Sequence, residues 1–456
     1  MGGENFWLLP VVLPLTGSFL SLICKERVRE ILGFLLPFAS FVILLIAPFI
    51  LKLPYKFLYF SLDIITVIFG MVFSLLGALS LLYSIPYLKK ERHNEEFYCL
   101  SLLLIGALIG VAYSRHLILL YIFWEMVAFA TWRLVGFYRE KRFVRIADKT
   151  FLMTFFGSTF MLLGILWIYL STGTLFMDEL KGNLPQGAFL FVLLGAIAKS
   201  ATLPLHTWLP DAHPVAPSPM SALLSGIVAK LGILIFIRLF PIFHHTPWKP
   251  FLILALFSSL AGGAGALFAQ DMKRVIAYST VSQLGFIFMG LALLTPMGWV
   301  GAILFFVAHA IAKGGLFLSA GVIEKATGTR DLEKLGGLIK SMPITAFSFA
   351  LCSVSIMGFP PLGGFFPKLM VIQGIVKEGY TAVAIGAIIS AVLTLLYLAR
   401  LFLKIFGGKE MYEGIKEKTP LMLFSAFLLG IISLGLGLVF PYLSDYLSSV
   451  IGIFGG

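Results

Sequence analysis

One apolar run of the sequence reads Phe189-Leu-Phe-Val-Leu-Leu-Gly-Ala-Ile-Ala-Lys-Ser-Ala-Thr-Leu-Pro-Leu-His-Thr-Trp-Leu-Pro-Asp211. It carries a lysine, Lys199, in its middle, and Pro204 breaks the expected helix soon afterwards. Ionisable groups deep in a membrane are rare and usually mark an ion or proton path, and broken helices are tolerated there only where they line a polar cavity. The run therefore predicts a functional site inside a membrane-spanning segment.

The composition is that of a membrane protein. Of the 456 residues, 59% are hydrophobic and 12% are charged, and the mean hydropathy is +0.99, more than a soluble core requires. The net charge of +12 does not indicate nucleic-acid binding, because the basic residues lie in short loops between apolar runs. Cys24, Cys99 and Cys352 are far apart and form no CxxC motif. We therefore expect no iron–sulfur cluster, zinc site or disulfide framework, and no bound cofactor.

Apolar stretches long enough to cross about 30 Å of hydrocarbon recur along the whole chain. We predict an all-α polytopic membrane protein with about 14 transmembrane helices. They lie near 6–23, 30–51, 57–84, 97–113, 116–138, 147–171, 187–208, 216–240, 250–269, 275–295, 298–322, 342–376, 380–405 and 419–441. A signal peptide is the alternative for the first stretch, but its acidic Glu4, two prolines and lack of a small-residue cleavage site favour a retained span.

The basic residues predict an orientation. Most of them, including Lys89, Arg142 and Lys334, follow odd-numbered spans, whereas the loops after even-numbered spans hold few. By the positive-inside rule the loops after odd-numbered spans are cytoplasmic. We therefore predict a multi-pass plasma-membrane protein with both termini outside.

A second break occurs in the twelfth predicted span, Met357-Gly-Phe-Pro-Pro-Leu-Gly-Gly-Phe-Phe-Pro-Lys368, where prolines and glycines interrupt an apolar run. The two broken helices, 7 and 12, are five spans apart, which predicts two inverted five-helix repeats of the kind found in transporters. The predicted organisation is residues 1–96 (helices 1–3), 97–240 (first repeat, helices 4–8), 249–405 (second repeat, helices 9–13) and 406–456 (helix 14 and tail).

Glu125 is expected about 14 Å into the fifth span, at 1.5 Å per residue. A carboxyl group at that depth either is neutral or pairs with a cation on another helix. Lys199 and Lys230 are the cations expected at a similar depth. Such a pair is either a structural clamp or a switchable ion pair, and the number of charges in the other spans favours the switch.

His309 and Lys313 are four residues apart and so share a helix face on which a proton could pass. The alternative is a histidine that bonds a carbonyl and a lysine whose ammonium group reaches the interface. Lys368 follows the second break as His206 follows the first. His206, Asp211, His213 and Lys149 are accessory candidates, the last either tuning Glu125 or lying at the lipid headgroups. The Arg238 side chain is expected to reach the membrane interface or a lipid headgroup. Asp63 is expected to lie at the membrane interface or to face a partner subunit.

These motifs resemble the antiporter-like ion-translocating subunits shared by respiratory complex I, Mrp-type Na⁺/H⁺ antiporters and membrane-bound hydrogenases. The resemblance covers residues 60–410. It rests on the run from Lys199 to Lys230, Trp124-Glu125, the stretch from Asp271 to Gly285, the stretch from His309 to Ala320, Gly328-Thr-Arg-Asp-Leu332 and the run from Gly358 to Lys368. The sequence after Asp211, Ala-His-Pro-Val-Ala-Pro-Ser-Pro, is similar to that of the hydrogenase and Mrp branches.

The resemblance implies a proton-translocation path through Glu125, Lys199, Lys230, Lys313 and Lys368, with His309 as a relay. It also implies a subunit without a catalytic centre of its own, in a multisubunit membrane complex that moves protons, with Na⁺ as a second candidate ion. Expected partners are other antiporter-like and small membrane subunits, and peripheral iron–sulfur subunits of a hydrogenase-like or NADH dehydrogenase-like oxidoreductase.

Three alternatives are a subunit of a non-redox Mrp-type antiporter, a self-sufficient secondary transporter, and a passive scaffold for a peripheral oxidoreductase. A scaffold has no need of five charges in the middle of the membrane.

Overall fold

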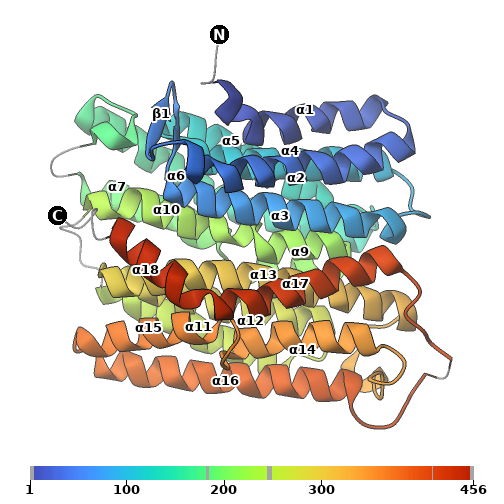
Figure 1. Cartoon of the computed structure of the whole chain (residues 1–456). Coiled ribbons are helices and arrows are strands. Elements are labelled where there is room, and N and C mark those ends of the chain that lie inside the picture. Colours follow the sequence, from blue (N-terminus) through green and yellow to red (C-terminus); the bar gives the residue numbers. More distant parts are fainter. Residues whose placement is uncertain (1–4, 181–183, 244–248, 413, 452–456) are drawn as a thin grey trace. The chain divides into compact units, whose positions relative to one another are not determined.

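The computed structural model describes residues 5–180, 184–243, 249–412 and 414–451, and helices make up most of them (Figure 1). The all-α fold predicted from the sequence is confirmed. The chain forms two compact units. The first comprises Met1–Lys199 and Val215–Thr246, and the second comprises Ser200–Pro214 and Pro247–Gly456. The segment after Lys199 therefore belongs to the second unit.

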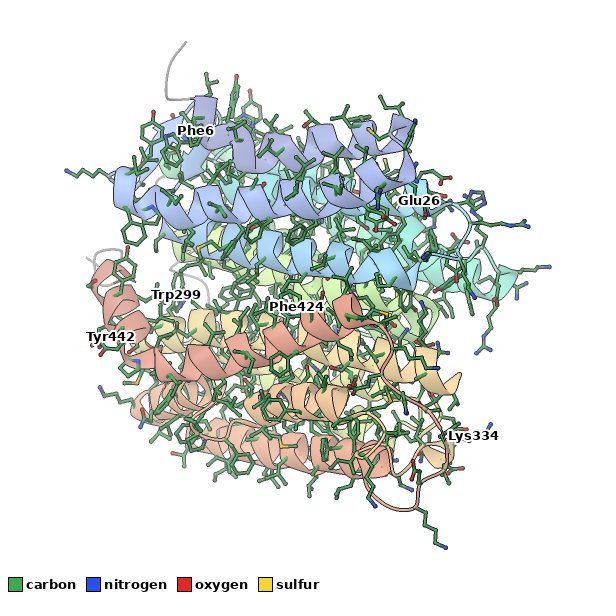
Figure 2. The ribbon with its side chains drawn as sticks, turned by 45° about the vertical axis from the view of Figure 1, so that its right-hand side comes forward. Phe6, Glu26, Trp299, Lys334, Phe424 and Tyr442 are labelled. Atoms are coloured by element: carbon green, nitrogen blue, oxygen red, sulfur yellow. The ribbon has the colours of Figure 1, made fainter. Side chains whose placement is uncertain are left out.

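The first unit contains a small hairpin and nine α-helices among its described residues. The strands are β1 (Tyr55–Phe57) and β2 (Phe60–Leu62), and the helices are α1 (Leu9–Ile23), α2 (Glu26–Ile50), α3 (Ile64–Tyr87), α4 (Asn94–Tyr113), α5 (Leu117–Val135), α6 (Lys141–Thr172), α7 (Gln186–Lys199), α9 (Ser218–Gly226) and α10 (Leu231–Leu239). Helices α1 to α4 pack side by side, and α6 packs on α7. Phe6 and Glu26 lie at opposite ends of α1 (Figure 2).

The second unit is built around α13, on which α12, α14, α15 and α17 pack. Its helices are α8 (Trp208–Val215, whose last residue falls in the first unit), α11 (Lys249–Phe268), α12 (Met272–Ala292), α13 (Pro296–Thr327), α14 (Pro343–Met357), α15 (Phe365–Lys377), α16 (Thr381–Phe406), α17 (Pro420–Leu438) and α18 (Phe440–Ile451). Trp299 near the start of α13 and Lys334 beyond its end lie at opposite ends of this unit (Figure 2).

Within the described ranges, twelve helices are long and apolar enough to cross a membrane. They fall in twelve of the fourteen predicted ranges. The other two ranges are those with the predicted breaks, and they hold shorter pieces: α7, and α14 followed by α15. The repeat boundaries stay a prediction. The terminal residues 1–4 and 452–456, whose side of the membrane was predicted, lie outside the described residues.

The third predicted span begins later than expected, because residues 55–62 form a hairpin. Phe57 pairs with Phe60 across its turn, and their rings lie 6.0 Å apart. Closely spaced aromatic residues suit a strand as well as a helix, so hydropathy alone did not separate the two. Asp63 then starts α3 by accepting a hydrogen bond from the Thr66 backbone N–H at 2.8 Å.

The eighth predicted span contains an interruption that the sequence did not predict. The α-helical pattern stops at Gly226 and resumes at Leu231, with a 3₁₀ turn, η3 (Val228–Lys230), between. The Lys230 ammonium group donates to the Ser225 carbonyl, which would otherwise accept the N–H of Ala229 in a continuous helix. A side chain that inserts into the backbone hydrogen-bond ladder of a helix in this way is a recognised cause of helix interruptions.

Arg238 is clamped inside the first unit and does not reach out to the interface as predicted. Its guanidinium group forms an ion pair with Asp63, and it also donates to the Thr66 hydroxyl at 2.7 Å and the Ala112 carbonyl at 3.2 Å. Both charged side chains are 15% exposed. The clamp joins the start of α3 and the end of α4 to α10, the helix that follows Lys230.

Asp63→Asn should lower the free energy of unfolding by about 3 kcal/mol, because it leaves the Arg238 charge buried without a counterion. Asparagine is as good a helix cap as aspartate, so the loss reports the ion pair and not the cap. Thermal unfolding of the detergent-solubilised chain measures it. The double variant Asp63→Asn/Arg238→Gln should recover part of the loss. A single variant as stable as the wild type would show that the clamp contributes nothing.

Candidate functional site

Lys199 is the last residue of α7, and its side chain is 1% exposed. The helix ends before Pro204, because a proline cannot donate to the helix and disfavours helical backbone in the residue before it. The last carbonyls of a helix have no partner within it and carry partial negative charge, which favours a cation at this end. The break thus supplies part of the surroundings that a buried ammonium group needs.

The Lys199 ammonium group lies over the indole ring of Trp124 on α5, 5.2 Å from the ring centroid. The carboxylate of Glu125, the next residue, acts on Lys199 electrostatically. Among the described ion pairs with an N···O distance of 4.0 Å or less, none joins Glu125 to Lys199. The predicted partners therefore act on one another without forming a contact ion pair, and an aromatic face holds the ammonium group.

Glu125 has a buried carboxylate oxygen, Oε1. Its side chain is half-buried, and among the described residues none forms a hydrogen bond with its Oε1 atom. Its charge also acts on the hydroxyl of Tyr121, one turn earlier on α5. Trp124 is fully buried. Its place next to Glu125 was among the motifs of the sequence, but its contact with Lys199 was not predicted.

Lys230 completes the predicted charges of the first unit. It is fully buried, and the interruption between α9 and α10 provides its acceptor, the Ser225 carbonyl. Helix α7, which carries Lys199, packs against the 3₁₀ turn that carries Lys230. The structure therefore places Glu125, Lys199 and Lys230 on packed elements of one unit.

Lys313 and His309 lie one turn apart on α13 in the second unit, and both are fully buried. The Lys313 ammonium group donates to the Ser279 hydroxyl at 2.7 Å and to the Ile276 carbonyl at 2.8 Å, both on α12. The alternative in which this lysine extends to the interface is therefore wrong, because its charge is bound in the interior.

Lys368 sits at the second break, on the first turn of α15, and is 4% exposed. Its ammonium group donates to the Ile356 carbonyl at the end of α14, at 2.6 Å. It also lies 5.3 Å from the centroid of the Phe305 ring, which is in turn 5.9 Å from the His309 ring. Gly358 has a φ of 87°, and a Cβ atom there would stand 3.1 Å from Cδ of Lys368. The break thus provides both an acceptor and room for the lysine.

The structure gives contacts for two of the accessory candidates, Asp211 and His213. Asp211 pairs with Arg274 at 2.7 Å, and the ring of His213 stacks on Phe317 at 4.2 Å. His206 is half-buried in the turn before α8. Lys149 is half-buried on the third turn of α6, because this helix begins at Lys141, earlier than predicted. Among the described residues no group of three or more His, Cys, Asp or Glu could hold a metal ion.

A family model described as NADH:quinone oxidoreductase/Mrp antiporter, TM, matches residues 114–394. Two curated relatives are Na⁺/H⁺ antiporter subunits. The one from Alkalihalophilus pseudofirmus is 36% identical over 426 residues, and the one from Staphylococcus haemolyticus is 34% identical over 420 residues. The alignments cover 84% and 83% of this chain and 52% of each relative. The chain therefore spans about half the length of the curated relatives it matches.

Two solved structures are similar over nearly the whole chain. A chain of the Mrp complex from Dietzia sp. DQ12-45-1b matches with a TM-score of 0.89 and 23% identity, covering 98% of this chain and 96% of that one. A chain of respiratory complex I from Thermus thermophilus matches with a TM-score of 0.86 and 26% identity, covering 97% and 99%. The family match extends from just before α5 into α16 and so includes all six predicted translocation residues, which makes this multi-pass membrane chain a member of the NADH:quinone oxidoreductase/Mrp antiporter family.

Proposed function

We propose that the chain is an antiporter-like, proton-translocating subunit of a multisubunit membrane complex. The observation that carries the proposal is the burial of four lysines, two in each unit, which are distinct from the equally buried Lys273, an ion-pair partner of Glu324 at 2.8 Å. Their exposed fractions are 1% for Lys199, 0% for Lys230, 0% for Lys313 and 4% for Lys368. Burying an ammonium group costs several kcal/mol unless it is well compensated, and family membership supports transport as the reason for this burial.

The contacts of these lysines favour proton exchange over a purely structural role. A structural ion pair in a protein interior needs close contact and full hydrogen bonding to offset desolvation. Lys199 instead faces a ring, with its carboxylate beyond contact distance, and Lys230 and Lys368 are held by helix-end or interrupted-helix carbonyls. A carbonyl accepts a hydrogen bond from a charged ammonium group and also from a neutral amine. Such surroundings tolerate both protonation states.

In the proposed mechanism the Glu125 and Lys199 pair is the switch of the first unit. At ~4 Å and an effective dielectric constant near ~20, the attraction between two unit charges is about 4 kcal/mol, and it weakens as they separate. A charge change in a neighbouring subunit that moves Glu125 would therefore change how firmly Lys199 holds its proton. The proton would pass to Lys230, while Lys313, His309 and Lys368 carry the path in the second unit.

Exchange of Na⁺ for protons is the coupling that the curated relatives favour, because those reported are Na⁺/H⁺ antiporter subunits. Coupling to redox chemistry in partner subunits, as expected from the sequence, is the second candidate, and the match to a chain of respiratory complex I supports it. Iron–sulfur partners belong to this second candidate alone. In either case the proposed partners include other antiporter-like membrane subunits.

Glu125→Gln and Lys199→Ala should each abolish coupled transport while the protein still accumulates in the membrane, because each removes one half of the proposed switch. Sodium-driven proton movement into inside-out vesicles, followed with a pH-sensitive dye, measures transport. Lys377→Ala, which removes an exposed lysine at the end of α15, is the matched control and should transport normally. Normal transport by both switch variants would favour a passive scaffold.

Trp124→Leu should reduce transport about tenfold and Trp124→Phe should reduce it less, because a cation over an aromatic face gains about 0.5–2 kcal/mol and leucine offers no such face. Initial rates in the same vesicles measure the effect. Trp132→Leu is the matched control, since Trp132 lies two turns further along α5 and donates to Asp148 at 2.9 Å. Equal rates for Trp124→Leu and the wild type would rule out a role for the ring in transport.

We also propose a plasma-membrane location with the loops after odd-numbered spans in the cytoplasm, on the distribution of basic residues. In a chain whose Cys24, Cys99 and Cys352 are replaced by serine, a cysteine at the exposed position Lys377 should react with an impermeant maleimide in intact cells. A cysteine at the exposed position Arg142 should react only in inside-out vesicles. Labelling of both positions from the same side would contradict the proposed orientation.

A further inference from the structure

A chain of buried hydrogen bonds leads away from Lys313 and is not part of the path described above. The Tyr397 hydroxyl on α16 donates to the Ser279 hydroxyl at 2.9 Å, and Ser279 accepts from Lys313. Gln283 Nε2, on α12, donates to the Tyr397 hydroxyl at 3.2 Å and to the Thr394 hydroxyl at 3.0 Å. All five side chains are fully buried. The chain joins α13, α12 and α16 within the second unit.

The two protonation states of a lysine make different demands on their neighbours. A charged ammonium group offers three donors and no acceptor, whereas a neutral amine also has a lone pair that needs a donor. Among the groups that bind Lys313 are the Ser279 hydroxyl at 2.7 Å and the Ile276 carbonyl at 2.8 Å, and the carbonyl only accepts. The Ser279 hydroxyl can accept from the ammonium group or turn and donate to the amine. Ser279 can therefore satisfy both states without a change in the backbone.

Tyr397 and Gln283 keep Ser279 ready for this exchange. Because Gln283 donates to the Tyr397 oxygen, the single phenolic proton is directed to Ser279. The Ser279 oxygen then has a donor whichever way its own proton points. Holding Gln283 in this orientation costs stability, since among the described residues none forms a hydrogen bond with its buried Oε1 atom.

We propose that Ser279 and Tyr397 are positioning residues that allow Lys313 to gain and lose a proton in a buried site. The inference rests on the proposed function and adds two residues to it that the sequence did not indicate. When Lys313 gives up a proton, one N–H bond breaks and the departing proton goes to the next group on the path. Ser279 then turns its hydroxyl proton toward the amine while Tyr397 continues to donate to the Ser279 oxygen, so no proton is gained or lost by the pair.

Other titratable groups on α13 and on the helices packed against it must be considered in any pH measurement. Helix α17 contains none among its residues. The others are His309, Glu324 and Lys325 on α13, Lys273, Arg274 and Tyr278 on α12, Cys352 on α14, Lys368 and Lys377 on α15, Tyr442, Asp445 and Tyr446 on α18, and His213 on α8, whose ring stacks on Phe317 of α13. None of them is altered in the variants below except Tyr278, which serves as the control.

The test is the pH profile of sodium-driven proton movement in inside-out vesicles that contain the whole complex. Ser279→Ala should lower the maximal rate about tenfold, the value of one lost buried hydrogen bond to a charged group, and Tyr397→Phe, which loses a bond to a neutral hydroxyl, should lower it less. Both variants should shift the pH of half-maximal rate. Tyr278→Phe removes the hydroxyl of the residue next to Ser279 on α12 and should change neither quantity.

A purely structural role predicts a different result, a lower amount of protein in the membrane with an unchanged pH profile per molecule, and that outcome would overturn the inference. If Tyr397→Phe fails to accumulate, Ser279→Ala decides alone, because it deletes one oxygen atom and leaves the phenol in place. Lys313→Ala separates the two proposals. If Lys313→Ala loses transport while the pH profiles of Ser279→Ala and Tyr397→Phe are unchanged, only the positioning role is rejected. Normal transport by Lys313→Ala would instead reject the proposed path in the second unit.

Discussion

A buried ammonium group needs hydrogen-bond acceptors, and an intact helix has few to spare. Each backbone carbonyl in the middle of a helix already accepts the N–H four residues on. A buried lysine that does not pair with a carboxylate, as Lys273 does with Glu324, must therefore find a helix end, an interruption or a hydroxyl group. Lys230 uses the interrupted helix at Ser225, and Lys368 uses the end of α14 at Ile356. The broken helices of this protein and its buried charges are two consequences of the same constraint.

Lys313 shows what happens when no break is near. It lies in the middle of the continuous helix α13, and its ammonium group reaches across to α12. There it shares the Ile276 carbonyl with the Thr280 hydroxyl, which donates to the same oxygen at 3.2 Å. A shared carbonyl is a weaker acceptor than a free one, and the Ser279 hydroxyl is a second acceptor for Lys313. The network behind Ser279 is thus the counterpart, on unbroken helices, of the breaks at Lys230 and Lys368.

The sequence predicted much of this arrangement where the cause is local. Proline and glycine mark the breaks after Lys199 and Met357, and apolar length marks most of the spans. It did not predict the interruption at Lys230, because Ser225-Gly-Ile227 carries only one weak breaker and the cause is a side chain that folds back on its own helix. The clamp between Asp63 and Arg238, and the contact of Tyr397 with Ser279, join residues more than a hundred positions apart. Periodicity and hydropathy contain no information on such pairs.

The surroundings of Lys199 show how a lysine proposed to exchange protons differs from one in a structural ion pair. A carboxylate in contact would hold the ammonium group so strongly that its proton would be difficult to release, since two unit charges at ~4 Å attract by about 4 kcal/mol even at an effective dielectric constant near ~20. The indole face of Trp124 offers about 0.5–2 kcal/mol and offers a neutral amine much less. Glu125 acts on Lys199 electrostatically, and no ion pair between them is among the described ones. In the proposed mechanism these contacts stabilise the buried lysine and still let it release its proton. In this mechanism a small movement of the Glu125 carboxylate then changes which protonation state of Lys199 prevails, and a coupling site inside a membrane requires this sensitivity.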